Sequence, residues 1–374
     1  MPIPRLNPLP FKIEQSPDRN LGLRPIIKVL EVFNPGCSKR AYMKKIIHFI
    51  GIDVSKETLD IALIRNNDKS NIYSSKVTNN KTGFKKMKQW LKLEKVSLQE
   101  AVFCIEHTGM YSKPVGQFIL SLQGNLWMEM SLKIIRSMGV QRGKNDKIDA
   151  MRIALYAQRC QDEMKLYEPP RPIVEKLRTL LQLRKRLINS RNSLQVPCNE
   201  LTTIDEQAGK EATRLIKSSV SALEKNIDVI NEQIDELITS DEQLAHEFEI
   251  GTSVPGIAKI TLAYIICFTN EFKNYSGGKQ LACYCGVVPF EYTSGKSVRG
   301  KPHVHNMANK FLKKLLHMGA IAAVTYYDEF KCYYKRKVEE GKPKMLVLNN
   351  VRNKMVLRLA AVIKNNKPYQ KIAA

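Results

Sequence analysis

The sequence is poor in acidic residues and has no long apolar run. Its 374 residues include 36 Asp and Glu against 60 Lys and Arg, which gives a net charge of +24. No apolar stretch approaches the roughly 20 residues that a membrane-spanning helix needs, so we expect no membrane partner. The shortage of negative charge excludes few folds, but it predicts a partner rich in phosphate, such as a nucleic acid.

Cysteine is also sparse. The eight cysteines are scattered over the chain, at positions 37, 104, 160, 198, 267, 283, 285 and 332. Cys283 and Cys285 are too close together for a zinc knuckle, and no matching pair of Cys or His follows at a suitable distance. We therefore expect free or buried thiols in a reducing cytoplasm, without disulfides or structural zinc.

Prolines are concentrated at the start of the chain. Residues 1–42 hold seven of the 17 prolines and show no sustained periodicity. Because proline removes a backbone donor and breaks helices, this segment is predicted to be a disordered extension. An apolar run follows Met43 directly, so we expect a second translation start there, with residues 1–42 an upstream or dispensable addition.

Residues 43–170 alternate between the two hydrophobic periods. Apolar residues typical of strands occupy 46–53, 59–65, 71–77, 101–106 and 126–130, and helical periods occupy 79–93, 111–122 and 145–161. The first two strands are joined by a short link and predict an antiparallel hairpin. Strands followed by alternating helices and strands predict an α/β domain with a mixed sheet.

The next segment, 171–250, has the period of long helices. Seven apolar residues from Ile216 to Leu237 repeat at steps of four and three, which is typical of a coiled coil. Arg184 and Arg191 occupy equivalent positions in an earlier helical register. Two helices separated near Pro197 can form an antiparallel hairpin or the seam of a dimer, and the sequence does not choose between them.

Residues 251–374 form the most basic part, with 21 basic and 6 acidic residues. VPGI at 254–257 predicts a turn between two helices, of the helix-hairpin-helix kind that can aim N–H groups at a phosphate, although a plain interhelical turn is equally compatible. A Gly- and Ser-rich loop or hairpin is expected at 286–302. Basic helices are expected near 306–325 and 347–364, which makes this domain mainly α.

Four carboxylates have the character of one metal site. Asp53 lies in the apolar run IGIDVSK (50–56), and Glu106 ends the apolar run AVFCIE (101–106). Asp146 and Asp149, three residues apart in KNDKIDA (144–150), share one helix face. A carboxylate inside a buried strand is costly unless a cation compensates it. Hard oxygen ligands favour Mg²⁺ or Mn²⁺, whereas each acid taken alone is explained as a cap or an ion pair, such as Asp149 with Arg152.

A second group of polar residues lies in the loop at 286–301. Ser294 and Ser297 are candidate nucleophiles, although Ser-Gly is common in ordinary turns. His303 and His305 have a spacing known from metal ligands, but loop residues or phosphate contacts explain them better. Further candidate nucleic-acid contacts are Lys144, Gly256, Lys259, Lys296, Arg299 and Lys301.

These ordered motifs resemble the DEDD-type transposases of the insertion-sequence 110 family. The resemblance rests on IGIDVSK, the Glu106 run and NDKIDA, followed by VPGI and by GVVP (286–289) leading to Ser294-Gly295. It covers roughly residues 43–365. It implies a RuvC-like N-terminal domain with a ribonuclease H fold, a helical coiled-coil linker, and a C-terminal transposase domain.

The resemblance also implies chemistry and partners. Asp53, Glu106, Asp146 and Asp149 would bind the metal, and Ser294 would attack a DNA phosphate to form a phosphoserine link. The expected partners are the DNA of element ends and target, a non-coding guide RNA, and further copies of the chain in a dimer or tetramer. The enzyme would work in the bacterial cytoplasm, at the nucleoid.

Two alternatives remain open at this stage. A RuvC-like endonuclease would use the four acids to hydrolyse branched DNA with water and would not need Ser294. A non-catalytic nucleic-acid-binding protein would have structural acids and no dependence on divalent metal.

Overall fold

The computed structural model describes residues 45–66, 68–107, 109–139, 146–275, 277–294 and 298–370. The predicted extension at 1–42 and the candidate contact Lys144 lie outside these ranges. Among the described residues, no helix has the length and apolar character required to cross a membrane. The seven described cysteines are free thiols, as predicted.

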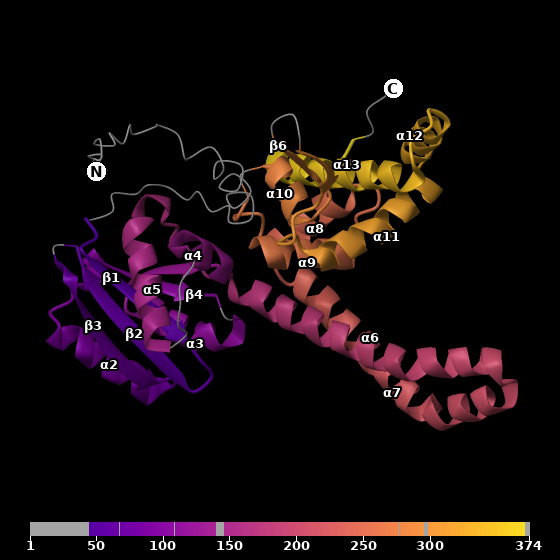
Figure 1. The fold of residues 1–374 in the computed structure, drawn as a ribbon. Helices are drawn as coiled ribbons and strands as arrows, with labels where there is room; N and C mark the ends of the chain where they lie inside the picture. Colours follow the sequence, from indigo (N-terminus) through magenta and orange to yellow (C-terminus); the bar gives the residue numbers. More distant parts are fainter. Residues whose placement is uncertain are drawn as a thin grey trace, which may run out of the picture.

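The N-terminal part is a mixed five-stranded sheet with helices on both faces (Figure 1). The strand order is β3-β2-β1-β4-β5. β1 (His48–Val54), β2 (Thr58–Arg65) and β3 (Asp68–Thr78) are antiparallel, whereas β4 (Ala101–Glu106) and β5 (Asn125–Glu129) continue the sheet in parallel with β1. The predicted hairpin and mixed sheet are therefore confirmed.

The side chains of each strand alternate between two apolar cores. Ile50 and Ile52 of β1 pack toward α2 (Lys81–Leu93) and α3 (Ser112–Ser121). Phe49 lies in the opposite core, with residues of α4 (Ser131–Met138) and α5 (Asp146–Arg159). Since strand side chains alternate, Gly51 and Asp53 share the α5 face with Phe49.

Gly51 is the point where α5 meets the sheet. A Cβ atom at this position would stand 2.3 Å from the carbonyl oxygen of Ala150 and 2.3 Å from the backbone nitrogen of Ala154. Both obstacles are backbone, so no rotation of a side chain can make room. Only glycine lets the helix approach β1 this closely.

Gly51→Ala is therefore expected to lower the free energy of unfolding by about 3 kcal/mol, because the helix must move away from the sheet. Gly277→Ala is the matched control, since a Cβ there would meet nothing within 4 Å, and its effect should stay within about 0.5 kcal/mol. Urea titration followed by circular dichroism measures both. Equal midpoints for the two variants would refute the close-packing argument.

Two long helices form an antiparallel hairpin, α6 (Pro172–Ile204) and α7 (Glu206–Thr239) (Figure 1). The guanidinium of Arg184 donates to Asn231 at 2.7 Å, and Arg191 approaches Glu224 at 3.9 Å. These positions progress in opposite directions along the two helices. Polar residues in the apolar seam thus pair across it and fix its register.

The predicted break near Pro197 is wrong, because Pro197 lies inside α6. The chain turns at Asp205, whose carboxylate accepts hydrogen bonds from the backbone of Gln207 and Ala208 and so caps α7. Gly209 permits the tight return, since a Cβ there would stand 2.4 Å from the Cα of Thr202. The position of the turn is therefore determined by the cap at Asp205 and not by Pro197.

The remainder is mainly helical, and its core also includes the bases of α6 and α7. Its helices are α8 (Glu242–Thr252), α9 (Lys259–Thr269), α10 (Gly278–Tyr284), α11 (Lys310–Tyr326), α12 (Asp328–Glu339) and α13 (Lys344–Asn365). Between α10 and α11 lies the hairpin of β6 (Phe290–Ser294) and β7 (Val298–His303). Helix α12 was not among the predicted elements.

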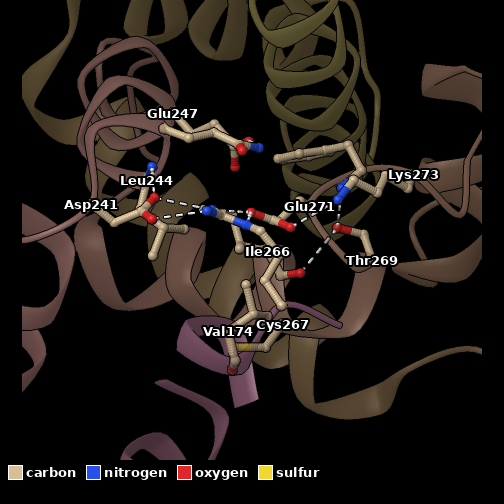
Figure 2. Close-up of polar contacts among 12 residues, drawn as sticks. Val174, Asp241, Leu244, Glu247, Ile266, Cys267, Thr269, Glu271 and Lys273 are labelled. Atoms are coloured by element: carbon tan, nitrogen blue, oxygen red, sulfur yellow. Dashed lines mark hydrogen bonds and ion pairs between the residues drawn. The ribbon is translucent and has the colours of Figure 1, made fainter. Parts of the chain in front are cut away.

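A charged joint ties the chain that enters α6 to the C-terminal core. Arg171 donates from Nε to Glu271 at 2.7 Å and from Nη1 to Asp241 at 2.8 Å. The carboxylates of Asp241 and Glu271 point toward one another across this interaction (Figure 2). Asn270, Glu271 and Phe272 have φ angles of 51°, 56° and 60°, so the joint also holds three successive non-glycine residues in left-handed conformation.

Arg171→Met is expected to destabilise the fold by about 3 kcal/mol, because the side chain of Glu271 is fully buried and, among the described residues, keeps Lys273 alone as a cationic partner. The double variant Arg171→Met with Glu271→Gln should recover most of the loss. Lys210→Met, which removes an exposed pair with Glu206, serves as the control and should cost less than about 0.5 kcal/mol. Calorimetry would contradict this account if the double variant were less stable than Arg171→Met alone.

Candidate active site

Asp53 and Glu106 lie side by side at one edge of the sheet. β1 and β4 are parallel, and their last registered pair is Ile52 with Ile105. The next residue on each strand is a carboxylate. Both acids alternate with residues of the α2 core, so both face α5. The strand ends therefore bring together two acids that are 53 positions apart in sequence.

Helix α5 brings the other two acids to the same edge. Asp146 and Asp149 occupy its first turn, and Asp149 directly precedes Ala150, the residue that contacts Gly51. Gly51 is two residues before Asp53 on the same face of β1. The glycine contact thus delivers the first turn of α5 toward Asp53, which explains why the site needs a residue without a side chain at position 51.

The electrostatics of Asp53 reflect this convergence. Burial, followed by the repulsion of neighbouring carboxylates, raises the pKa of Asp53 to about 6. The contributing carboxylates, in decreasing order, are Glu106, Asp149, Asp146 and Asp60. All four predicted acids are therefore close enough to interact, and their mutual repulsion is the kind that a bound cation relieves.

Asp60 is a fifth carboxylate, which the sequence interpretation missed. It lies opposite Asp53 in the β1–β2 register and is 8% exposed. The ammonium of Lys76, its partner on β3, lies 2.9 Å from Asp60 and 3.9 Å from Asp146. Its signal was an acid inside the apolar run LDIALIR (59–65), the same signal that identified Asp53.

The remaining acids have protein partners. Glu106 accepts a hydrogen bond from the hydroxyl of Ser131, and Asp149 pairs with Arg152 at 2.7 Å. Within the described residues, no three His, Cys, Asp or Glu side chains are arranged as a ligand group for a metal ion. The donors are all carboxylate oxygens, which suit Mg²⁺ or Mn²⁺ in kind. To surround an ion, Glu106 and Asp149 would have to turn from Ser131 and Arg152.

The candidate nucleophile, Ser294, lies at the C-terminal end of strand β6 in the β6–β7 hairpin. Ser294 is the last residue of β6 and pairs with Val298 of β7. Its side chain, those of Arg299 and Lys301, and residues 295–297 with Lys296 and Ser297 lie outside the described part. The distance from Ser294 to the acids therefore stays a prediction.

The foot of this hairpin is firmly held. Asn349 of α13 donates to the carbonyl of Val287 at 2.8 Å, and the backbone of Asn309 donates to the carbonyl of Tyr284 at 2.8 Å. Gly286, with φ of 69°, packs against Ala308 and Lys313. The GVVP motif thus positions the strand that leads to Ser294.

Two other candidate nucleic-acid contacts have structural partners. Gly256, with φ of 86°, packs against the carbonyl oxygen of Gly319, where a Cβ would be 2.8 Å away. Lys259 pairs with Asp235 at 2.7 Å and remains half exposed. His305 accepts a hydrogen bond at Nδ1 from the backbone of Met307. His303 ends β7.

Comparison with known proteins places these features in a family. A model described as "Transposase", for the DEDD type of IS110 elements, matches residues 50–204. A second, described as "Transposase IS116/IS110/IS902 family", matches residues 249–335. The chain belongs to the insertion-sequence 110 family of transposases. The first match contains the four acids and the second contains Ser294.

Relatives of this transposase are similar over most of their length. It is 27% identical to the pilin gene-inverting protein of Moraxella bovis over 332 residues, which cover 86% of this chain and 98% of that protein. It is 24% identical to the transposase for insertion sequence element IS1533 of Leptospira borgpetersenii, covering 62% of this chain and 72% of the relative. Transposases of this family are DNA recombinases that act by phosphoryl transfer.

Proposed function

We propose that this transposase excises and inserts its own mobile element by a serine-mediated exchange of DNA strands. The observation that carries the proposal is the convergence of four carboxylates on Asp53 in one matched segment, combined with Ser294 at a hairpin end in the other. The mixed sheet, with a hairpin followed by parallel strands and helices, is compatible with a ribonuclease H-like, RuvC-like domain.

The proposed chemistry conserves the number of phosphoester bonds. The oxygen of Ser294 bonds to phosphorus while the bond from phosphorus to a sugar oxygen breaks, and that oxygen takes up a proton. The freed hydroxyl of another strand then attacks the phosphoserine and releases Ser294. Because the ester retains the bond, the strands rejoin without an external energy source.

The carboxylates supply the electrostatics of the proposed site. Asp53, Glu106, Asp146 and Asp149 would hold Mg²⁺ or Mn²⁺, which would polarise the scissile phosphate and neutralise its charge. Asp53 is the central member, since it is the residue whose burial and neighbours most oppose an uncompensated charge. Without the cation, Ser131 holds Glu106 through its hydroxyl and Arg152 holds Asp149, and both carboxylates would turn from these partners to bind it.

Guide RNA and oligomer formation complete the proposal. The net charge of +24 supports contact with two nucleic acids, and the α6–α7 hairpin offers a surface for a second copy in a dimer or tetramer. Such an enzyme would act at the bacterial nucleoid. Inversion of a DNA segment is a second candidate outcome, favoured by similarity to a gene-inverting protein over 98% of its length.

A strand-transfer assay tests the proposal. The protein is incubated with DNA of the element ends, transcribed flanking RNA and Mg²⁺, and covalent adducts are sought after denaturation. We expect an adduct that disappears with EDTA and that forms at the correct site only when the RNA is present. Cleavage without an adduct would favour hydrolysis, and binding without cleavage would favour the non-catalytic alternative.

A further inference from the structure

Arg352 of α13 is a buried cation for which the described residues provide no acidic partner. Its residue is 6% exposed, and its Nε has no hydrogen-bond partner among the described residues. Burial lowers the pKa of Arg352, and no carboxylate contributes to the shift. Because a buried guanidinium without an acceptor is costly, its presence here calls for an acceptor beyond the described residues.

Two basic side chains of α11 lie near Arg352. Lys313 and His317 are four residues apart, on one helix face, and burial, followed by the charge of Arg352, lowers the pKa of both. The Nδ1 of His317 is also buried without a partner among the described residues. Three basic groups therefore share one location, and no acid is among the charges that shift the pKa of any of them.

The neighbouring arginine shows what an ordinary structural role requires. Arg358, less than two turns farther along α13, donates to the carboxylate of Glu329 at 3.2 Å. The described residues thus supply Arg358 with an acid from α12 but supply none to Arg352. Arg352 is the more buried of the two and has the greater need for a counter-charge.

The basic cluster of Lys313, His317 and Arg352 lies at the foot of the hairpin that carries Ser294. The Cδ of Lys313 is 3.5 Å from where a Cβ on Gly286 would stand. Asn349, three residues before Arg352, donates to Val287 in the same stretch. A phosphate held by the cluster would therefore belong to a strand that passes beside the β6–β7 hairpin.

We propose that Lys313, His317 and Arg352 bind one backbone phosphate of the DNA and position the strand for Ser294. The guanidinium can donate two parallel hydrogen bonds to phosphate oxygens, the ammonium adds a point charge, and the imidazole adds a further donor. The site is separate from the four acids, and it rests on the proposed function in taking DNA as the partner and Ser294 as the reacting residue.

Binding of a labelled element-end duplex by the full-length protein, followed by fluorescence anisotropy at increasing KCl, tests the site. Arg352→Met and Lys313→Met are each expected to weaken binding about tenfold, since each removes a charged phosphate contact. Each should also reduce the slope of log affinity against log salt by about one. Lys364→Met, which removes an exposed cation from the same helix, should change binding less than about twofold.

Thermal unfolding separates this role from a structural one. Arg352→Met should not lower Tm, because it removes a buried charge that has no partner, whereas Arg358→Met should lower it by breaking the pair with Glu329. A fall in Tm for Arg352→Met with normal DNA binding would overturn the proposal. The proposal would also be overturned if Arg352→Met and Lys313→Met weakened the binding of RNA but left the binding of DNA unchanged. The binding assay needs no catalysis. If the unaltered protein shows no strand transfer but its DNA binding still depends on Lys313 and Arg352, the proposed function is refuted and the phosphate site stands.

Discussion

Ser294→Ala is expected to abolish the covalent protein–DNA adduct and to lower strand transfer by about 10⁴-fold or more. Alanine lacks the hydroxyl that would bond to phosphorus, and removal of a nucleophile typically has an effect of this size. Binding of element-end DNA should stay within about twofold, because a single uncharged hydroxyl contributes little to phosphate affinity. Denaturing gels of end-labelled DNA, with and without protease, measure the adduct.

Ser297→Ala is the matched control in the same hairpin region. It removes a hydroxyl three residues away and should keep both adduct and transfer. If Ser297→Ala loses the adduct and Ser294→Ala keeps it, the nucleophile is misassigned. If cleavage survives Ser294→Ala but is lost in Asp53→Asn, the enzyme hydrolyses DNA with water and the serine mechanism is wrong.

Most of the N-terminal fold could be predicted because its elements, apart from the missed helix α4, have a clear period. Phe84, Met87 and Leu91 repeat at steps of three and four, and all three are buried on the inner face of α2. Strands β1 and β4 are nearly continuous apolar runs, as strands covered on both faces must be. An acid in such a run is conspicuous, which is why Asp53 and Glu106 could be identified before the structure placed them together.

Other features depend on contacts between segments that are distant in sequence. The turn at Asp205 was hidden because Pro197 is a stronger local signal, yet α6 continues through it. Asp60 was passed over because its importance lies in its register opposite Asp53. Arg352 reads as one basic residue among many, and only its burial beside two other basic groups distinguishes it.

Asp53→Asn is expected to lower metal-dependent strand cleavage by about 10²–10³-fold. The substitution keeps the shape of the side chain but removes the central charge of the proposed metal site. Glu57→Gln removes an exposed carboxylate from the turn after β1 and should leave cleavage unchanged. The rate is measured at saturating Mg²⁺ and again at limiting Mg²⁺, where a loss of metal affinity adds to the defect.

Asp53→Asn should also stabilise the metal-free protein, because the raised pKa of Asp53 means that its negative charge opposes folding. Asp53 has a pKa of about 6 in the folded chain against 3.8 unfolded, so its charge opposes folding at pH values above about 6. The penalty is complete above about pH 6, falls as the folded state takes up the proton below that pH, and vanishes below about 3.8, where the unfolded state is protonated as well. The pKa shift of Asp53 corresponds to a loss of at most about 3 kcal/mol in the free energy of unfolding. Solvent screening of the partly exposed site reduces this loss to about 1–2 kcal/mol.

In EDTA, Asp53→Asn should therefore unfold at higher urea than the unaltered protein at pH 7.5, and the difference between the two midpoints should shrink at pH 5 and close below about pH 4. Saturating Mg²⁺ should reverse the order at pH 7.5, because the cation stabilises only the site that retains its carboxylate. A variant less stable than the parent at pH 7.5 in EDTA would mean that Asp53 is held by favourable contacts. The carboxylates would then form a structural network, and the case for a metal site at this edge of the sheet would fail.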